Sequence, residues 1–488
     1  MIRAIPAFVS LQLIAGSLLW TAVASAQVAG RHSDHPLLVS SSGSGSGSGE
    51  EPLPARTISD LTCTPAPCVL PNVQVSADLT NGPLVAVSPS NSSEVLAVAF
   101  DENCNGTGAY ASANRGSTWN TTCLDDLASV GSPSLAYGRE AEYAVGTNGD
   151  SFGATTYVQH STGKGKWTGQ VEVVGPLLGN GETNVPWVQV DNSKSSSFAN
   201  AVYVSVTQFD PEVVFSEISA SHSTNGGETW TTTTVDPVQI KPLVDQFSQM
   251  AIGLDGTVYV TWQRCTMTGP TVNCADTEAD MLLSKSTDGG NTWSVPVQIA
   301  AVNLVPETCS CSAFFGNLPN TNEAMDDIPA IAIDNGTGTH AGNLYVVMYN
   351  WTGTHMQVQV VTSTDGGNTW GKPVLVAPAK ETHDQFFGTI AVSASGAVGV
   401  SWLDRRNDPL NVSYQPFAAV SMNGGESFGT NYTLATNLSD PYLDGSGGVY
   451  MGDNIGNTWA GNTTLLVTWP DTRSLEYMQD YVGGVLIK

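Results

Sequence analysis

The stretch Ser286-Thr-Asp-Gly-Gly-Asn-Thr-Trp293 decides the fold of this chain, because close copies of it recur along the sequence. Two copies keep the full pattern, and they are Ser223-Thr-Asn-Gly-Gly-Glu-Thr-Trp230 and Ser363-Thr-Asp-Gly-Gly-Asn-Thr-Trp370. Three further copies are looser or shortened, and they run over Ser112–Trp119, Ser161–Trp167 and Ser421–Phe428. Self-similarity of this kind is the signature of a repeat architecture, in which each unit is one supersecondary element.

Each residue of the repeat has a physical role in a hairpin turn. Asp or Asn accepts hydrogen bonds from the backbone of its own turn, the Gly pair adopts positive φ without steric cost, and the aromatic residue covers the hairpin. We therefore predict a structural role, in preference to ligand binding, for one set of residues: Asn114, Asn225, Asp288, Asp365 and Asn423, with Trp119, Trp230, Trp293 and Trp370.

Strand patterns of constant order surround the repeats. In the unit around Trp293, alternating or β-branched residues predict strands over 247–254, 257–262, 281–285 and 293–299. The next unit predicts strands over 328–333, 344–349, 357–362 and 370–376. The repeat therefore joins the third and fourth strands of each unit, and four antiparallel strands form one blade of an all-β propeller.

The last unit indicates how the ring closes. It supplies three strand patterns, over 450–455, 464–469 and 481–487, and a fourth is missing. The segment Leu70–Ala77 is similar to the fourth strands of other units, so we expect it to complete the final blade and leave no open sheet edge. Six repeats and this composite blade predict seven blades, which begin near residues 78, 130, 183, 244, 326, 384 and 448. A six-bladed propeller is the alternative, with the first or second unit as an insertion.

The repeat resembles the Asp box, also called the bacterial neuraminidase repeat, of sialidases, sortilin and related propellers. Sialidases of this family combine an arginine triad that clamps the substrate carboxylate, a tyrosine nucleophile assisted by a glutamate, and an aspartate acid. The resemblance offers the following residues for these roles: Arg264, Arg405 and Arg473 for the triad, Tyr450 for the nucleophile, and Asp384 or Asp404 for the acid. The Arg-Ile-Pro-like motif of sialidases is missing from this chain, and sialidases have six blades.

Arginine is scarce in this chain, yet four arginines follow the second strands of predicted blades: Arg264, Arg405, Arg406 and Arg473. Two arrangements are open. The guanidinium forks can converge over the propeller axis and bind the carboxylate of an acidic sugar. Alternatively, each arginine pairs with an aspartate beside it or in the next blade, such as Asp404 or Asp471, and locks the ring.

A second, acidic series stands where blades begin: Asp245, Asp326, Asp327, Asp384 and Asp453. Carboxylates held in an apolar rim can act as general acid or base, and several together can bind a hard cation. Aspartates at strand starts also cap turns. We take Asp453 and Asp471, with the four arginines, as the candidate substrate-binding set. The sequence establishes no cofactor and leaves a hard cation such as calcium open.

The first 60 residues differ in character from the rest. Residues 1–26 contain Arg3, an apolar stretch and the small residues Ala24-Ser-Ala26, which together indicate a secretory signal peptide. A membrane anchor is the alternative, but it needs about 20 unbroken apolar residues. Residues 27–60 form a Ser/Gly-rich flexible linker, so the propeller is expected over 61–488. No later segment is long and apolar enough to span a bilayer.

The composition indicates an extracellular protein. A formal net charge of −27 makes nucleic acid and anionic membranes unlikely partners. The eight cysteines favour disulfides, with the local pairs Cys63–Cys68, Cys104–Cys123 and Cys265–Cys274. A bond between Cys309 and Cys311 would close a small, strained ring, so pairing of either with another cysteine, or an exposed redox or metal role, stays open. Asn-X-Ser/Thr sequons for glycosylation begin at Asn91, Asn105, Asn120, Asn335, Asn350, Asn411, Asn431, Asn437 and Asn462.

These features predict a secreted or cell-surface propeller whose partner is an extracellular glycan or glycoprotein. Three classes of function are open: a glycoside hydrolase or lyase, exo-sialidase-like if a hydrolase; a non-enzymatic binding module; and a structural cell-surface component. The first requires a pocket with two carboxylates about 5–10 Å apart. The second predicts exposed aromatic side chains and satisfied Asp–Arg pairs. The sequence does not indicate an oligomeric state.

Overall fold

The computed structural model describes residues 61–124, 127, 130–150, 153–163, 166–177, 181–210, 215–267, 274–308, 316–325, 327–445 and 447–488. The predicted signal peptide (1–26) and linker (27–60) lie outside these residues, as do Cys309, Cys311 and Asp326. Within the described ranges, no helix has the length and apolar character that a membrane span needs.

The described chain is all-β apart from two short 3₁₀ helices, η1 (Glu102–Cys104) and η2 (Pro441–Leu443). Four sheets each contain four antiparallel strands in chain order. Their strands are β3 (Thr80–Val87), β4 (Val95–Asp101), β5 (Gly106–Ser112) and β6 (Asn120–Leu124); β15 (Leu243–Ile252), β16 (Val258–Thr266), β17 (Glu278–Ser286) and β18 (Val297–Asn303); β21 (Ala330–Ile333), β22 (Leu344–Trp351), β23 (Met356–Ser363) and β24 (Val374–Leu375); and β25 (Gln385–Val392), β26 (Val398–Asp404), β27 (Gln415–Ser421) and β28 (Tyr432–Thr433).

An eight-stranded sheet joins two more such units, because β11 pairs with β9 at Glu182 and Ala154. Its strands are β7 (Val130–Tyr137), β8 (Glu142–Asp150), β9 (Gly153–Ser161), β10 (Val171–Val174), β11 (Glu182–Val190), β12 (Val202–Asp210), β13 (Phe215–Ser223) and β14 (Thr231–Ile240). The final sheet contains β29 (Gly456–Ala460), β30 (Thr464–Asp471) and β31 (Gln479–Leu486), with the N-terminal strands β1 (Cys68–Val69) and β2 (Val73–Gln74) paired to β31. A separate hairpin consists of β19 (Gly316–Asn317) and β20 (Ala324–Met325).

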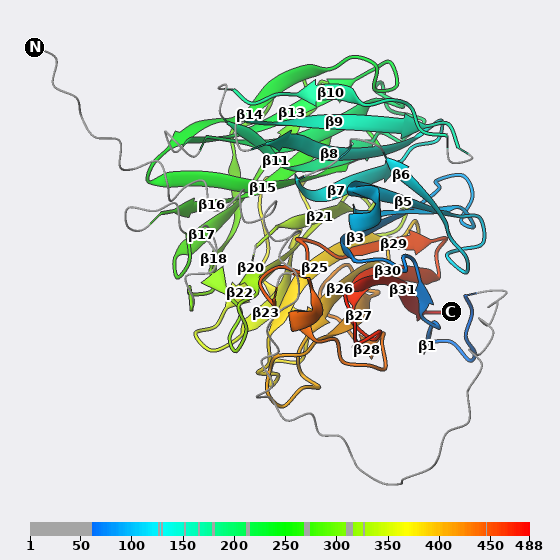
Figure 1. Ribbon diagram of the computed structural model, residues 1–488. Coiled ribbons are helices and arrows are strands. Elements are labelled where there is room, and N and C mark those ends of the chain that lie inside the picture. Colours follow the sequence, from blue (N-terminus) through cyan, green and yellow to red (C-terminus); the bar gives the residue numbers. More distant parts are fainter. Residues whose placement is uncertain are drawn as a thin grey trace, which may run out of the picture.

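The first strand of each unit packs against the first strand of the next. The order of these contacts is β3, β7, β11, β15, β21, β25 and β29, and β29 returns to β3. The two ends of the series lie side by side in Figure 1, where blue β3 runs next to orange-red β29. These strands line a cavity of about 300 Å³, to which every one of the seven contributes residues. Sheets of this order, arranged around a channel, are those of a β-propeller.

The repeated stretches form tight turns between the third and fourth strands of their units. In the turn between β17 and β18, Ser286 Oγ donates to Asp288 Oδ1 (2.8 Å) and accepts the N–H of Gly290 (2.9 Å). Asp288 in turn accepts the N–H of Thr292 (2.9 Å), and Gly289 and Gly290 have φ values of 75° and 86°. Corresponding Ser, Asp or Asn, and Gly contacts occur in the turns at 112–119, 223–230, 363–370 and 421–428.

The order of the strands agrees with the sequence prediction, but one predicted strand is absent and two others begin later than predicted. Residues 450–455 do not form a strand, and the first strand of the last unit is β29. The N–H groups of Tyr450 and Met451 donate to the carboxylates of Asp444 (2.9 Å) and Glu323 (3.0 Å). These two N–H groups are therefore used by side chains and do not form strand-to-strand hydrogen bonds. The predicted fourth strands from 293 and 370 likewise begin only at β18 and β24, several residues later.

The covalent cross-links agree with the sequence prediction. The structure contains the disulfides Cys63–Cys68, Cys104–Cys123 and Cys265–Cys274. The first of them lies in the N-terminal segment just before it pairs with β31, at Cys68 opposite Leu486. The N-terminal segment is therefore held both by a disulfide and by the last strand of the chain.

Candidate functional site

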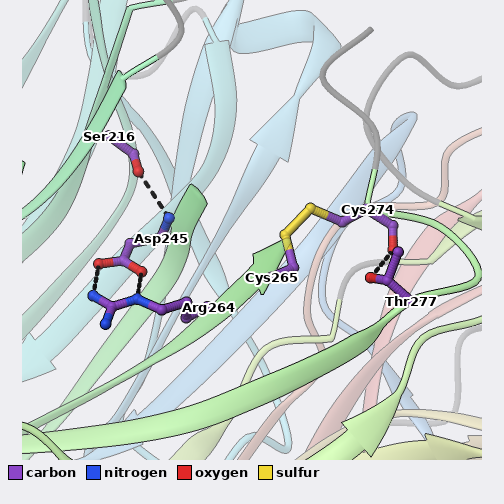
Figure 2. The surroundings of a disulfide bond; sticks show 6 residues. All are labelled: Ser216, Asp245, Arg264, Cys265, Cys274 and Thr277. Carbon is purple, nitrogen blue, oxygen red and sulfur yellow. Dashed lines mark hydrogen bonds and ion pairs between the residues drawn. A yellow bond between two sulfur atoms is a disulfide. The ribbon is translucent and has the colours of Figure 1, made fainter. Parts of the chain in front are cut away.

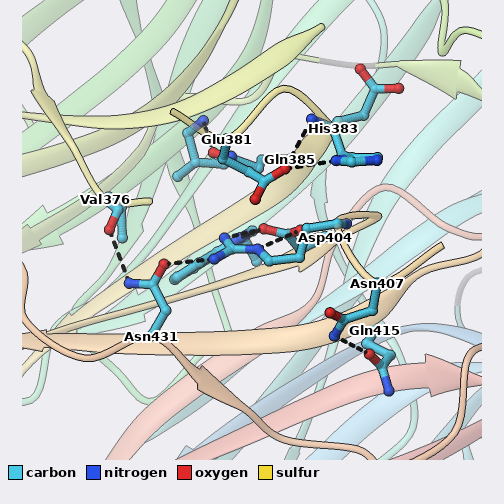
Figure 3. Close-up of polar contacts among 12 residues, drawn as sticks. Val376, Glu381, His383, Gln385, Asp404, Asn407, Gln415 and Asn431 are labelled. Carbon is cyan, nitrogen blue, oxygen red and sulfur yellow. Dashed lines mark hydrogen bonds and ion pairs between the residues drawn. The ribbon is translucent and has the colours of Figure 1, made fainter. Parts of the chain in front are cut away.

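Asp404, one of the predicted catalytic acids, lies at the end of β26, where Trp402 and Arg406 donate hydrogen bonds to its carboxylate. It is completely buried, and it accepts the indole N–H of Trp402 (2.7 Å) and the Nε–H of Arg406 (2.9 Å). Arg406 also donates to Asn431 Oδ1 (3.1 Å), and its guanidinium carbon lies 4.4 Å from the centroid of the Phe417 ring. Figure 3 shows Asp404 with the guanidinium beside it and Asn431 beyond.

A second arrangement of this kind lies at the end of β30. Asp471 is completely buried and accepts from Trp469 Nε1 (2.9 Å) and from Arg473 Nε (2.9 Å) and Nη2 (2.6 Å). Arg473 donates also to Asn72 Oδ1 (3.0 Å) of the N-terminal segment and lies 4.0 Å over the Tyr481 ring. We call this arrangement the Trp-X-Asp-X-Arg clamp. Its spacing is visible in the sequence, although the sequence analysis named its aspartates and arginines without recognising the motif.

Arg264 is held by two aspartates. Its Nε and Nη2 donate to both oxygens of Asp245 (2.6 and 2.7 Å), and Nη2 also contacts Asp236. Figure 2 shows the two parallel bonds to Asp245, close to the Cys265–Cys274 disulfide. Burial, together with the second carboxylate of Asp236, raises the pKa of Asp245 to about 7.

Arg405 makes a separate set of contacts from its neighbour Arg406. Its side chain is completely buried, and Nη1 lies 3.4 Å from Asp384 Oδ2. The guanidinium also donates to the carbonyl of Pro319 (3.0 Å) and to Thr321 Oγ1 (3.0 Å), both in the hairpin of β19 and β20. Arg405 therefore fastens this hairpin to the loop that follows β26.

A carboxyl group that sequence reasoning missed lies next to Arg405. Glu323, in the same hairpin, is completely buried, and its Oε2 has no hydrogen-bond partner. Burial raises the pKa of Glu323 well above its ordinary value, Asp444 and Asp453 raise it further, and Arg405 opposes them. Of the predicted set, Arg405 and Asp453 thus act on Glu323, and Asp384 adjoins this group through its ion pair with Arg405. Tyr450 adjoins them, because its N–H is bound by Asp444 (2.9 Å).

The four arginines therefore occupy ion pairs with aspartates of the chain, the second of the two arrangements that the sequence left open. No sequence signal pointed to Glu323 or Asp444, because Glu323 lies in the turn of the β19–β20 hairpin and Asp444 caps the end of η2, with no recurring pattern around either. Among the described residues, no group of three or more His, Cys, Asp or Glu side chains is arranged to hold a metal ion. What this site offers chemically is a buried carboxyl group of raised pKa beside ionisable neighbours.

Comparisons with known proteins identify no family for this chain. No protein-family profile matches it. No curated protein matches it. Solved structures resemble it in fold: an ulvan lyase (13% identity, TM-score 0.49, 85% of this chain and 96% of the other), Penicillium chrysogenum α-L-arabinanase complexed with arabinobiose (13%, 0.45, 86% and 99%), and the leech intramolecular trans-sialidase (10%, 0.38, 86% and 86%). At these scores the similarities carry no argument about activity, and the description of the fold rests on the strand pairing.

Proposed function

We propose that the chain is a secreted, seven-bladed propeller of the Asp-box type, with a signal peptide over 1–26, a linker over 27–60 and a propeller over 61–488. Seven first strands that pack in a closed series and line one cavity support the number of blades. The pairing of β1 and β2 with β31 supports closure by the N-terminal segment. The three disulfides agree with an oxidising, extracellular environment.

The function that the geometry supports best is recognition of an extracellular glycan without hydrolysis. The observation that carries this proposal is that the predicted arginines are already neutralised, Arg406 and Arg473 within their clamps and Arg264 between two aspartates. An arginine that left such a pair to bind a substrate carboxylate would strand a buried aspartate, at a cost of several kcal/mol. The net charge of −27 also repels anions. We therefore propose a neutral glycan, in preference to an acidic sugar.

Glycoside hydrolysis is the second candidate, and one observation favours it. Glycosidases need a carboxyl group that stays protonated and another that stays ionised. Glu323, whose pKa is raised by burial, has Asp444 and Asp453 as carboxyl neighbours. Because Glu323 is completely buried, a substrate reaches it only if the hairpin of β19 and β20 moves.

Two assays on the purified mature protein distinguish these candidates. A glycan array reports binding, and a panel of fluorogenic glycosides, sialosides included, reports turnover. Binding of neutral glycans without turnover supports the proposal. The result favours hydrolysis over recognition if the wild-type protein shows turnover, the folded Glu323→Gln variant loses it, and the Ser286→Ala variant retains it. If the protein shows neither binding nor turnover, both candidates are contradicted and a structural role at the cell surface remains.

A further inference from the structure

The cavity inside the ring of first strands lies toward the face of the propeller that carries the repeated turns. Its lining includes the last residues of three first strands, Val87 of β3, Ile252 of β15 and Val392 of β25. The repeated turns follow third strands, which run in the same direction as the first strands and so end at the same face. The arginines lie at or after the ends of second strands, which run in the opposite direction. The cavity is therefore separate from the site around Glu323 and Arg405.

The lining of this cavity carries no charged side chain. Among the described residues that line it there is no Asp, Glu, Lys, Arg or His, although the chain contains 44 Asp and Glu residues. A charged ligand would therefore enter without a counter-ion, and burial of an unpaired charge is costly. The cavity thus suits a neutral molecule.

Two glutamine side chains in the lining have no hydrogen-bond partner in the protein. Gln249 of β15 is only 4% exposed, and Gln189 of β11 is half-buried. Neither amide group forms a hydrogen bond with another residue in the described part of the chain. Because buried polar groups are almost always hydrogen-bonded, these amides need a partner within the cavity, either water or a polar ligand. An apolar ligand would leave them unpaired.

An aromatic ring lies beside one of these amides. Trp187 also lines the cavity, and it precedes Gln189 by two residues in a regular part of β11. Side chains two residues apart on a strand point to the same face, so the indole and the amide are neighbours. A sugar ring presents C–H groups on its faces, which pack on an aromatic ring, and hydroxyl groups at its edge, which bond to amides. The cavity volume of about 300 Å³ is at the lower end of the range for small-molecule sites, which favours one sugar ring over a chain.

We propose that this cavity binds the terminal residue of a neutral glycan. The inference rests on the proposed function, recognition of a neutral glycan, and names the site of that recognition. Gln189 and Gln249 hydrogen-bond to hydroxyl groups of the sugar, and Trp187 packs against one face of its ring. The rest of the glycan leaves the cavity at the face of the repeated turns, opposite Glu323.

The test is the binding of methyl glycosides to the purified mature protein, measured by ligand-observed NMR titration. The panel contains the methyl glycosides of glucose, galactose and mannose, each beside the methyl glycoside of its uronic acid. We expect at least one neutral glycoside to bind. Its uronic acid counterpart should bind at least about tenfold more weakly, because the described lining has no cation to pair with the carboxylate.

Substitution of the cavity glutamines assigns the binding to this site. Gln249→Leu removes the amide at similar size and should weaken the binding by at least about tenfold. Gln74→Leu is the matched control, because Gln74 of β2 is exposed and lies outside the cavity, and it should leave the affinity unchanged. If Gln249→Leu does not fold, Gln189→Leu on the adjoining first strand decides by the same criterion.

Three outcomes overturn this inference. If no neutral glycoside binds, the cavity holds water only, and neutral glycans that still bind on the array would keep the proposed function. If the cavity variants bind as tightly as the wild-type protein, the sugar binds elsewhere and recognition alone survives. Equal affinity for a neutral glycoside and its uronic acid contradicts a site without charge.

Discussion

Arg405 and Asp384 form an ion pair from which solvent is excluded, since both side chains are completely buried and 3.4 Å separates Nη1 from Oδ2. Burial lowers the pKa of Arg405 and raises that of Asp384. The pair does not stand alone, because the carbonyls of Pro319 (3.0 Å) and Asn411 (3.2 Å) accept from the same guanidinium nitrogen. One arginine therefore joins three loops at the site around Glu323.

Replacement of Arg405 should be among the most destabilising changes in the chain. Arg405→Met leaves Asp384 and Glu323 buried without their cation, and such a change costs about 3–5 kcal/mol. Urea unfolding measures the loss. Arg115→Met is the control, because Arg115 is exposed and its replacement should change the free energy of unfolding by less than about 0.5 kcal/mol. Equal effects of the two substitutions would contradict the buried ion pair.

Asp404 should act as a structural residue rather than as an acid. Asp404→Asn keeps the shape of the clamp but removes the charge that holds Arg406 and the indole of Trp402, so we expect a loss of about 2–3 kcal/mol. Asp471→Asn should cost a similar amount, since its clamp has the same contacts. The affinity for glycan should not change. An Asp404→Asn protein of native stability without glycan binding would place Asp404 in the functional site instead.

The sequence predicted the parts of the fold that local chemistry determines. The turn at Ser286–Trp293 specifies itself, because Ser286, Asp288 and Gly290 bond to one another within a few residues. Strand periodicity around each turn then gives the order of the strands. The same local reasoning failed over 450–455, where an apparently extended segment is held by Glu323, which is 128 residues from Met451 in the sequence.

The candidate site was harder to predict, because it depends on contacts between loops. Arg405 and Arg406 are neighbours in sequence, yet Arg406 pairs with Asp404 two residues away and Arg405 with the hairpin more than 80 residues away. From the sequence alone, either arginine could pair with Asp404 or with a distant loop. The direction of each side chain was therefore open until the packing of the hairpin was known.

The free energy of unfolding should be greatest at mildly acidic pH. The pKa of Asp245 is raised to about 7, against about 4 in an unfolded chain, so the folded state binds more protons between these values. Stability therefore falls as the pH rises from about 4 to 7. Below about 4 the sign reverses, because hydrogen bonds from Thr292 lower the pKa of Asp288 to about 2.

Thermal unfolding between about pH 4 and pH 8 tests this dependence. Asp327→Asn isolates one contribution, because burial raises the pKa of Asp327 well above its ordinary value and asparagine cannot ionise. We expect a shallower decline with pH in this variant than in the wild-type protein. Parallel profiles for the two proteins would mean that Asp327 is ionised in the folded state.

The serine of the repeated turn should matter more for stability than the aspartate of the same turn. Ser286 is buried, and its Oγ accepts the buried N–H of Gly290 (2.9 Å), so Ser286→Ala leaves that N–H without a partner and should cost about 1–3 kcal/mol. Asp288 accepts from Thr292 at an exposed position, where water can replace it, so Asp288→Ala should cost no more than about 1 kcal/mol. Urea unfolding of the two variants measures the difference. The reverse order would mean that the turn depends on the carboxylate, and that its exposed hydrogen bonds, rather than the buried one, hold β17 and β18 together.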